Sequence, residues 1–402
     1  MTPRRFVFVV PPLAGHINPT LAVGGELRAR GHDVAWVGYP EVLTDLLPDD
    51  WPFVAVTDRL PGPLVQAIEQ RAAGLRGAAA LKFLWEDFLH PLAEGMVDGL
   101  ADALDALDPD VVIVDQQTVA GAVVAERDGW CWTTSSTTSA ELVDPFEGLP
   151  KIRAWADQLL VDFQVAHGLP AEEATADRVR SSPHLTLAFT TPALVGDRLH
   201  ATRPVAFVGP AFGRPDDTPF PRGLLNVDGP KVLVSLGTVN AEAGERFFRA
   251  AAEGLTGGGG RTIIVAPPDL VGPVPDDVHV ARRVPQLALL PHLDAVVSHG
   301  GHNTVCETLA HGVPLVVAPI RDDQPVIAQQ VVAAGAGVRI RFARPTPATV
   351  AGAVDRVLAD RALRAGARRI AESFAEAGGA PAAADHLLAL AEAHRPTLAA
   401  RP

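Results

Sequence analysis

Short runs of valine, isoleucine and leucine recur along the whole chain, each separated from the next by a segment with helical spacing. In the first half they lie at residues 6–10, 34–37, 111–114, 185–189 and 205–208. In the second half they lie at residues 231–236, 262–266, 294–298 and 314–318. Short apolar strands that alternate with helices are typical of a parallel sheet covered by helices on both faces. The pattern therefore predicts an α/β protein.

One stretch rich in proline, glycine and aspartate interrupts the alternation and has the composition of a linker. A chain of 402 residues is long enough for two domains that each bury a core. We expect two Rossmann-like domains, at residues 1–212 and 230–380, joined by a linker at 213–229 and facing each other across a cleft. Residues 381–402 are expected to form a C-terminal helix that packs back on the first domain.

Composition excludes several classes of partner. A formal net charge of −13 disfavours binding to nucleic acid or to anionic lipid. No segment approaches the roughly 20 apolar residues that a membrane span needs. Cys131 and Cys306 lie far apart in apolar stretches, which predicts neither a disulfide framework nor a metal site and favours a reducing compartment. We expect a cytoplasmic monomer or homodimer that binds small molecules.

Two helical segments, at about residues 61–100 and 139–179, carry most of the aromatic side chains of the first half. These aromatic residues either form core helices beside the sheet or line an apolar pocket for a small molecule. The sequence does not separate the two interpretations.

The segment from residue 283 to residue 324 carries the most informative motif. A strand is expected at 294–298, followed by a glycine turn at 299–301 and by a helix that begins near Asn303. Such a turn presents free backbone N–H groups and the positive end of the helix dipole, which suit a diphosphate. Glu307 lies one helical turn beyond Asn303, on the same face. A carboxylate at that place can accept hydrogen bonds from both ribose hydroxyls.

This stretch resembles the C-terminal signature of family 1 glycosyltransferases, which include plant secondary-product and bacterial macrolide glycosyltransferases. The spacings from His299 to Glu307 and from Glu307 to Asp323 match that signature without gaps. The resemblance implies a GT-B fold and a UDP- or TDP-sugar as co-substrate. A further glycine-threonine pair, Gly237 and Thr238, is similar to the family's phosphate contact at the end of the first strand of the second domain.

The resemblance also implies a role for each matched residue. The base would contact Arg283, Val284 and Gln286. The diphosphate end of the donor would contact Gly15, Gly237, Thr238, His299, Gly300, Gly301, His302, Asn303 and Thr304. The ribose would contact Glu307, and the sugar would contact Asp323 and Gln324. Many relatives carry tryptophan where this chain has Arg283; a guanidinium plane also stacks on a base, so uridine and thymidine stay open.

His16 and Asp115 are the expected catalytic pair. His16 follows the first strand in a loop without the GxGxxG fingerprint, which disfavours a dehydrogenase. Removing a proton from an acceptor hydroxyl calls for a base within hydrogen-bond reach, and imidazole is the usual one. Asp115 ends the strand at 111–114, so it reaches the same sheet edge and can orient the imidazole. The resemblance implies that this pair acts in an inverting transfer.

No essential metal is expected. The string Asp108-Pro109-Asp110 has the form of a metal-binding DxD motif, but it precedes a strand instead of ending one. Without a metal, the departing diphosphate would depend on the helix N-terminus and on side-chain donors.

The local string at residues 114–125 is also similar to bacterial zeaxanthin glucosyltransferases.

Structural explanations and other functions compete with this interpretation. A glycine pair is often only a turn, and Asn303, His16 and Asp115 each fit a helix-capping role. The other functions considered are a non-catalytic protein that binds a nucleotide sugar and assists a partner, a nucleotide-sugar epimerase, and a lipid-linked transferase of the same plan. A donor hydrolysis assay separates the non-catalytic protein from the enzymes.

Overall fold

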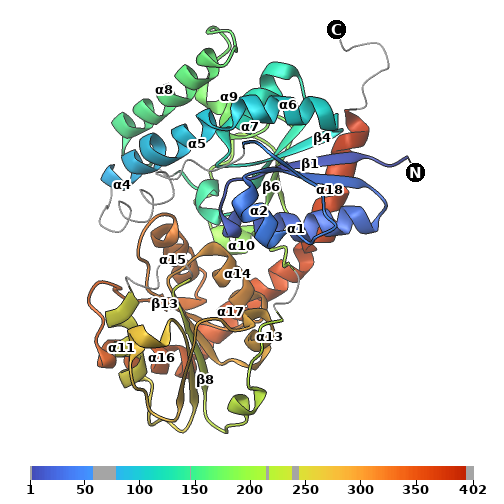
Figure 1. Cartoon of the computed structure of the whole chain (residues 1–402). Helices are drawn as coiled ribbons and strands as arrows, with labels where there is room; N and C mark the ends of the chain where they lie inside the picture. The colour runs from blue at the N-terminus through green and yellow to red at the C-terminus, as the bar shows by residue number, and fades with distance from the viewer. Residues whose placement is uncertain (1, 58–77, 145, 214–216, 238–243, 395–402) are drawn as a thin grey trace.

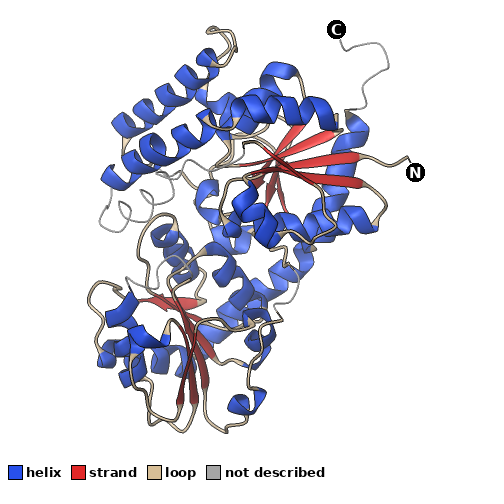
Figure 2. Cartoon of the chain, in the orientation of Figure 1, coloured by secondary structure: helices blue, strands red, loops and turns tan. Residues whose placement is uncertain are grey.

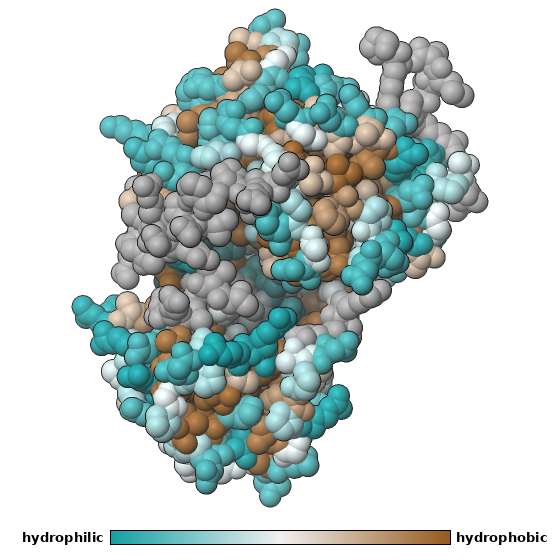
Figure 3. All heavy atoms as spheres, in the orientation of Figure 1, coloured by the Kyte–Doolittle hydropathy of each residue, from teal (hydrophilic) through white to brown (hydrophobic). Residues whose placement is uncertain are grey.

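The computed structural model describes residues 2–57, 78–144, 146–213, 217–237 and 244–394. It contains two α/β units, each built on a parallel sheet with helices on both faces (Figures 1 and 2). This arrangement confirms the predicted fold class. Hydrophilic and hydrophobic side chains are mixed over the face of both units seen in Figure 3. None of the described helices is long and apolar enough to cross a membrane.

The first sheet has the strand order β3-β2-β1-β4-β5-β6-β7. Its strands are β1 (Arg5–Val9), β2 (Asp33–Gly38), β3 (Phe53–Ala55), β4 (Val111–Asp115), β5 (Trp132–Ser136), β6 (Thr186–Ala188) and β7 (Val205–Phe207). The helical elements around it are α1 (Ala14–Ala29), α2 (Pro40–Leu46), α4 (Ala78–Phe83), the π-helical η1 (Leu84–Leu89), α5 (His90–Glu94), α6 (Val97–Leu107), α7 (Val119–Asp128), η2 (Ser139–Leu142), α8 (Pro150–Ala166), α9 (Ala176–Arg180) and α10 (Pro192–Val195).

The second sheet has the order β10-β9-β8-β11-β12-β13. After the short helix η3 (Arg222–Leu225), its strands are β8 (Lys231–Ser235), β9 (Arg261–Val265), β10 (Val278–Ala281), β11 (Ala295–Ser298), β12 (Leu315–Val317) and β13 (Gly337–Arg339). The helical elements are α11 (Glu245–Gly254), α12 (Pro268–Val271), α13 (Gln286–Leu289), η6 (Leu290–His292), α14 (His302–Ala310), α15 (Gln324–Ala333), α16 (Pro347–Ala359), α17 (Arg361–Ala377) and α18 (Gly379–Ala393).

The strand order determines where each sheet can bind a ligand. In the first sheet β1 lies between β2 and β4, with Val9 opposite Val114. In the second, β8 lies between β9 and β11, with Ser235 opposite Ser298. The order reverses direction at each of these pairs, and ligands of open α/β sheets bind at such switch points, outside the carboxyl ends of the strands.

Strand β5 was not predicted, because its sequence is polar. Its Thr-Thr-Ser-Ser run is nevertheless buried, and its two threonine hydroxyls find backbone partners. The Thr133 hydroxyl donates to the Leu185 carbonyl at 2.8 Å, and the Thr134 hydroxyl accepts from the Ser182 amide at 2.8 Å. Strands β3, β10 and β13 were also missed; each has only three or four residues, too short for an apolar run to stand out.

Helix α1 begins at Ala14 and contains Pro19 in its interior. His16 therefore belongs to the first turn of the helix and not, as was expected from the sequence, to a loop. The helix tolerates the proline because the freed carbonyl of Gly15 finds another donor, as described below.

Helix α18 ends the described chain and lies across the first unit (Figure 1). Its buried residues, among them Ala383, Ala384 and Leu387, join the apolar cluster beneath α1 and β1. Ion pairs between Arg30 and Asp385 and between Arg4 and Glu392 lie along the same contact. The last helix therefore connects the two units a second time.

Candidate active site

His16 and Asp115 meet at the carboxyl edge of the first sheet. His16 Nδ1 lies 3.0 Å from each carboxylate oxygen of Asp115, whose side chain is fully buried. The Thr137 hydroxyl lies 2.8 Å from the same ring nitrogen and donates to Asp115 Oδ2 at 3.2 Å. The backbone N–H of Gln117 donates to Asp115 Oδ1 at 2.9 Å. Several donors therefore hold the carboxylate in place.

This geometry assigns the tautomer of His16. An ionised carboxylate only accepts hydrogen bonds, so Nδ1 carries the proton and Nε2 has a lone pair. No residue that the structure describes bonds to Nε2. Burial lowers the pKa of His16, but the charge and hydrogen bond of Asp115 outweigh it, so the pKa is raised above the ordinary value. With 14% of its side chain exposed, His16 can act as a proton acceptor.

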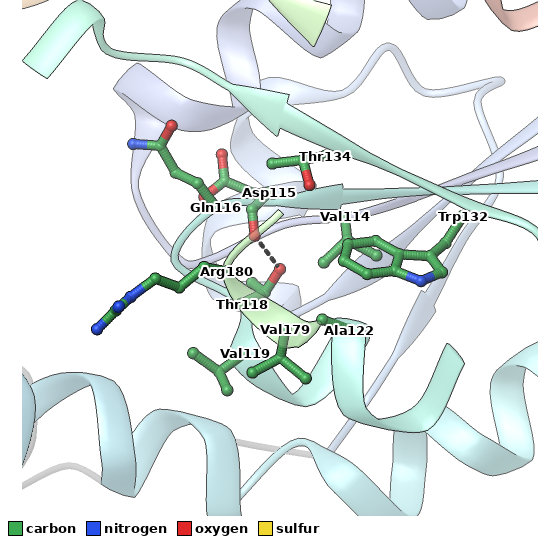
Figure 4. A pocket seen from close by; sticks show the side chains of 10 residues that line it. All are labelled: Val114, Asp115, Gln116, Thr118, Val119, Ala122, Trp132, Thr134, Val179 and Arg180. Atoms are coloured by element: carbon green, nitrogen blue, oxygen red, sulfur yellow. Dashed lines mark hydrogen bonds between the residues drawn. The ribbon is translucent and has the colours of Figure 1, made fainter. Parts of the chain in front are cut away.

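A small hollow, with no room for a water molecule, lies next to Asp115 (Figure 4). Residues of β4, α7, β5 and α9 line it, and the Thr118 hydroxyl fixes the turn after β4 by donating to the Asp115 carbonyl at 2.8 Å. The side-chain amide of Gln116, which also lines the hollow, is buried and has no hydrogen-bond partner in the described part of the chain.

The second unit supplies the strand–turn–helix expected for a diphosphate. Gly300 has a φ of 93°, and a Cβ there would lie 2.8 Å from Val317 Cγ1. Helix α14 begins at His302 after the cap residue Gly301, one position before the predicted start, and no side chain caps it. The first-turn amides, including those of Asn303 and Thr304, are therefore without a capping side chain. A helix end of this kind suits an anion.

His299 lies between two glycines at this helix end. A Cβ at Gly237 would lie 2.9 Å from His299 Cε1, and one at Gly301 would lie 2.6 Å from Nε2, so no larger residue fits at either place. Burial lowers the pKa of His299 to about 4, so the ring is neutral. Its Nδ1 atom is buried without a hydrogen-bond partner among the described residues. Thr238, the other expected phosphate contact, lies outside the described residues.

The residues predicted to hold base and ribose are joined by one hydrogen bond. Gln286 Nε2 donates to Glu307 Oε2 at 2.6 Å. Burial raises the pKa of Glu307 to about 7, although the bond from Gln286 lowers it. Val284 is buried in the core of the second unit, which leaves only its backbone to contact a base, while Arg283 is exposed.

Three of the predicted donor residues contact the first unit. Asn303 Nδ2 donates at 3.0 Å to the Gly15 carbonyl, because Pro19, four residues later in the helix, has no N–H to donate to it. His302 Nδ1 accepts from the Ser139 amide at 3.3 Å, and its Nε2 donates to the Phe189 carbonyl at 3.2 Å. Asp323 Oδ2 accepts from the Thr138 hydroxyl at 2.7 Å. These contacts connect the two units.

Gln324 makes its hydrogen bonds within the second unit. Its Oε1 atom accepts from the backbone amides of Ile320 and Arg321, at 2.9 and 3.1 Å. The side chain at the start of α15 thus folds back on the turn that precedes the helix. This oxygen stabilises the loop after β12, and a contact between Gln324 and the sugar stays a prediction.

Comparison with known proteins agrees with this geometry. Residues 262–390 match the family model of the erythromycin biosynthesis protein CIII-like C-terminal domain. The chain is 31% identical to 4'-demethylrebeccamycin synthase of Lentzea aerocolonigenes, over 92% of this chain and 96% of that one. It is 30% identical to demethyllactenocin mycarosyltransferase of Streptomyces fradiae, over 95% and 85%. The chain belongs to this family of glycosyltransferases. The crystal structure of the calicheamicin glycosyltransferase CalG4 has the same fold, with a TM-score of 0.81 and 24% identity over 98% of this chain and all of that one.

Two adjacent threonines of this glycosyltransferase were missed by sequence reasoning. Thr137 contacts His16 and Asp115, while Thr138 donates to Asp323 of the second unit. Both follow strand β5, and the polar composition that hid this strand also hid them. A buried polar run before a predicted helix was the available signal. The charge of Asp323 is one of the causes that raise the pKa of His16, so the two halves of the site lie close together.

Proposed function

We propose that this glycosyltransferase transfers a sugar, with inversion, from a UDP- or TDP-sugar to a hydroxyl of a small hydrophobic acceptor. The observation that supports this most is the His16–Asp115 pair, with Nε2 free and only two threonines separating it from the donor half. The proposal extends to a natural product, antibiotic, polyphenol or carotenoid as acceptor, because the similar enzymes are named for antibiotic substrates.

In the proposed mechanism, His16 Nε2 takes the proton of the acceptor hydroxyl as its oxygen bonds to the anomeric carbon. The bond from that carbon to the diphosphate breaks in the same displacement. Asp115 remains ionised and stabilises the imidazolium. The uncapped amides at the start of α14 stabilise the departing diphosphate. Gly237 and Gly301, two of the residues expected to contact the donor, lie against the His299 ring, where a larger residue would collide with it.

The acceptor would lie beside the first sheet. A second hollow, with room for about one water molecule, is lined mainly by apolar residues of η1, α5, α7 and α8, including Trp85, Leu89 and Phe163. It shares Val119 with the hollow next to Asp115. Phe88 and Phe146 are buried core residues, so only part of the aromatic set lines a hollow. The π-helical turn η1 also favours a binding role, because such turns are frequent at functional sites.

A screen of donors against acceptors, read by mass spectrometry, tests the reaction class. An α-linked nucleotide sugar is expected to give a β-linked product, because one base and no placed carboxylate nucleophile allow a single displacement. Transfer is expected to continue in excess EDTA. The anomeric coupling of the product, measured by NMR with and without chelator, reports both. An α-linked product, or complete loss of transfer in EDTA, contradicts the mechanism.

Substitution of Glu307 tests the donor half. Glu307→Gln removes a charged acceptor and is expected to weaken donor binding by about 1.5–3 kcal/mol. The bare nucleoside diphosphate should weaken equally, since it carries the same ribose. Asp323→Asn is the matched control: it should weaken the intact sugar donor and hardly affect the diphosphate. Calorimetry that gives the reverse pattern overturns both assignments.

A further inference from the structure

Three metal-binding side chains from distant parts of the chain meet on the first unit. Cys131 immediately precedes β5, His184 precedes β6, and His394 follows the last turn of α18. One ligand atom of each lies within 4.8 Å of the other two. The two imidazole rings meet edge to face, with centroids 4.2 Å apart.

The ligand set fits zinc. Thiolate and imidazole are both ligand types that bind Zn²⁺, and a water molecule would complete this set of three to a tetrahedron. With Zn–N near 2.0 Å and Zn–S near 2.3 Å, bound ligand atoms lie about 3.3–3.7 Å apart. The observed separations exceed this by about 1.5 Å at most, which side-chain rotation covers, since Cys131 is only half-buried and His394 is exposed.

The surroundings of His394 also suit a ligand. Its Nδ1 atom donates to the Leu390 carbonyl at 3.1 Å, which leaves Nε2 free. A metal-binding histidine usually makes such a bond through its other nitrogen, which fixes the tautomer and the ring orientation. The bond closes the last turn of α18 and restrains the orientation of the ring.

We propose that Cys131, His184 and His394 bind one Zn²⁺ ion that fastens the end of α18 to the first unit. Burial raises the pKa of the Cys131 thiol to about 12, so binding replaces a thiol proton, which passes to solvent. The ion would reinforce a contact whose surface ion pairs, such as Arg4–Glu392, contribute little by themselves.

The proposed Zn²⁺ site lies far from the catalytic pair. Cys131 and Thr137 flank strand β5, so the two ends lie roughly 20 Å apart at about 3.3 Å per residue. The proposal is therefore independent of the proposed function and consistent with transfer that continues in EDTA. It departs from the sequence expectation for Cys131, because the three ligands share no motif spacing.

Metal titration of the full chain without an affinity tag tests the site. After chelation and dialysis, one equivalent of Zn²⁺ is expected to bind by calorimetry, and one of Co²⁺ should give a thiolate-to-metal charge-transfer band. Cys131→Ser should abolish the band, and His394→Ala should weaken Zn²⁺ binding at least tenfold. His386→Ala, which removes another exposed histidine of α18, should change neither.

Melting temperatures distinguish the Zn²⁺ proposal from the proposed catalytic function. EDTA is expected to lower the melting temperature of the wild type and not that of Cys131→Ser, while the transfer rate at room temperature is unchanged in both. His184→Ala provides a second variant should Cys131→Ser fail to fold. Failure to bind one equivalent of Zn²⁺, or binding that is equally tight in the Cys131, His184 and His394 variants, overturns the proposal.

Discussion

His16→Ala is expected to lower the rate of sugar transfer by roughly 10²–10⁴-fold while donor affinity stays within a few-fold. The reason is that Nε2 acts on the acceptor proton, and the donor is held by the other unit. Single-turnover transfer gives the rate, and calorimetry with the nucleoside diphosphate gives the affinity.

His200→Ala is the matched control for that variant. His200 is exposed, and its backbone amide, which donates to the Leu142 carbonyl, is unaffected by the substitution. Transfer by this control should equal that of the wild type. If His16→Ala loses donor affinity in proportion to its loss of rate, His16 is part of the donor site and not the base.

Asp115→Asn is expected to slow transfer by about 10²–10⁴-fold, with a shift in its pH dependence. An amide no longer forces the proton onto Nδ1, so the ring loses its orientation and the imidazolium loses its counter-ion. The base form of His16 exists above its pKa, which Asp115 raises. Removing that charge lets burial lower the pKa, so the acid limb of kcat/KM moves to lower pH while the plateau falls.

The charges of Asp323 and Glu141 also raise the pKa of His16 and persist in this variant, so the shift should be partial. Asp110→Asn is the control, because Asp110 lies just before the opposite end of β4 and accepts from the Arg5 amide. It should leave the acid limb unchanged. An unchanged profile and rate in Asp115→Asn would remove this carboxylate from the mechanism.

The features of the fold and of the site that depend on local sequence patterns were predicted. Apolar runs gave the principal strands of both sheets, and the strand-end positions of His16 and Asp115 placed them at one sheet edge, where they meet. The glycine turn before α14 was also predicted, within one residue of the helix start.

Contacts between the two units could not be predicted, because they depend on how the sheets face each other. Asn303 bonds to Gly15 only because Pro19, inside α1, leaves that carbonyl without an intrahelical donor. Thr138 meets Asp323 because the loop after β5 reaches the start of α15. No periodicity or motif spacing in one unit carries this information about the other.

The two threonines after β5 also set the order in which the site is assembled. Thr137 bonds only within the first unit, to His16 and Asp115, whereas Thr138 bonds across to Asp323. A hinge motion that separates the units would break the second bond and leave the first intact. The base would thus keep its tautomer and orientation through every opening of the cleft. Each new donor would meet a base already in position, and closure would need to align only the sugar.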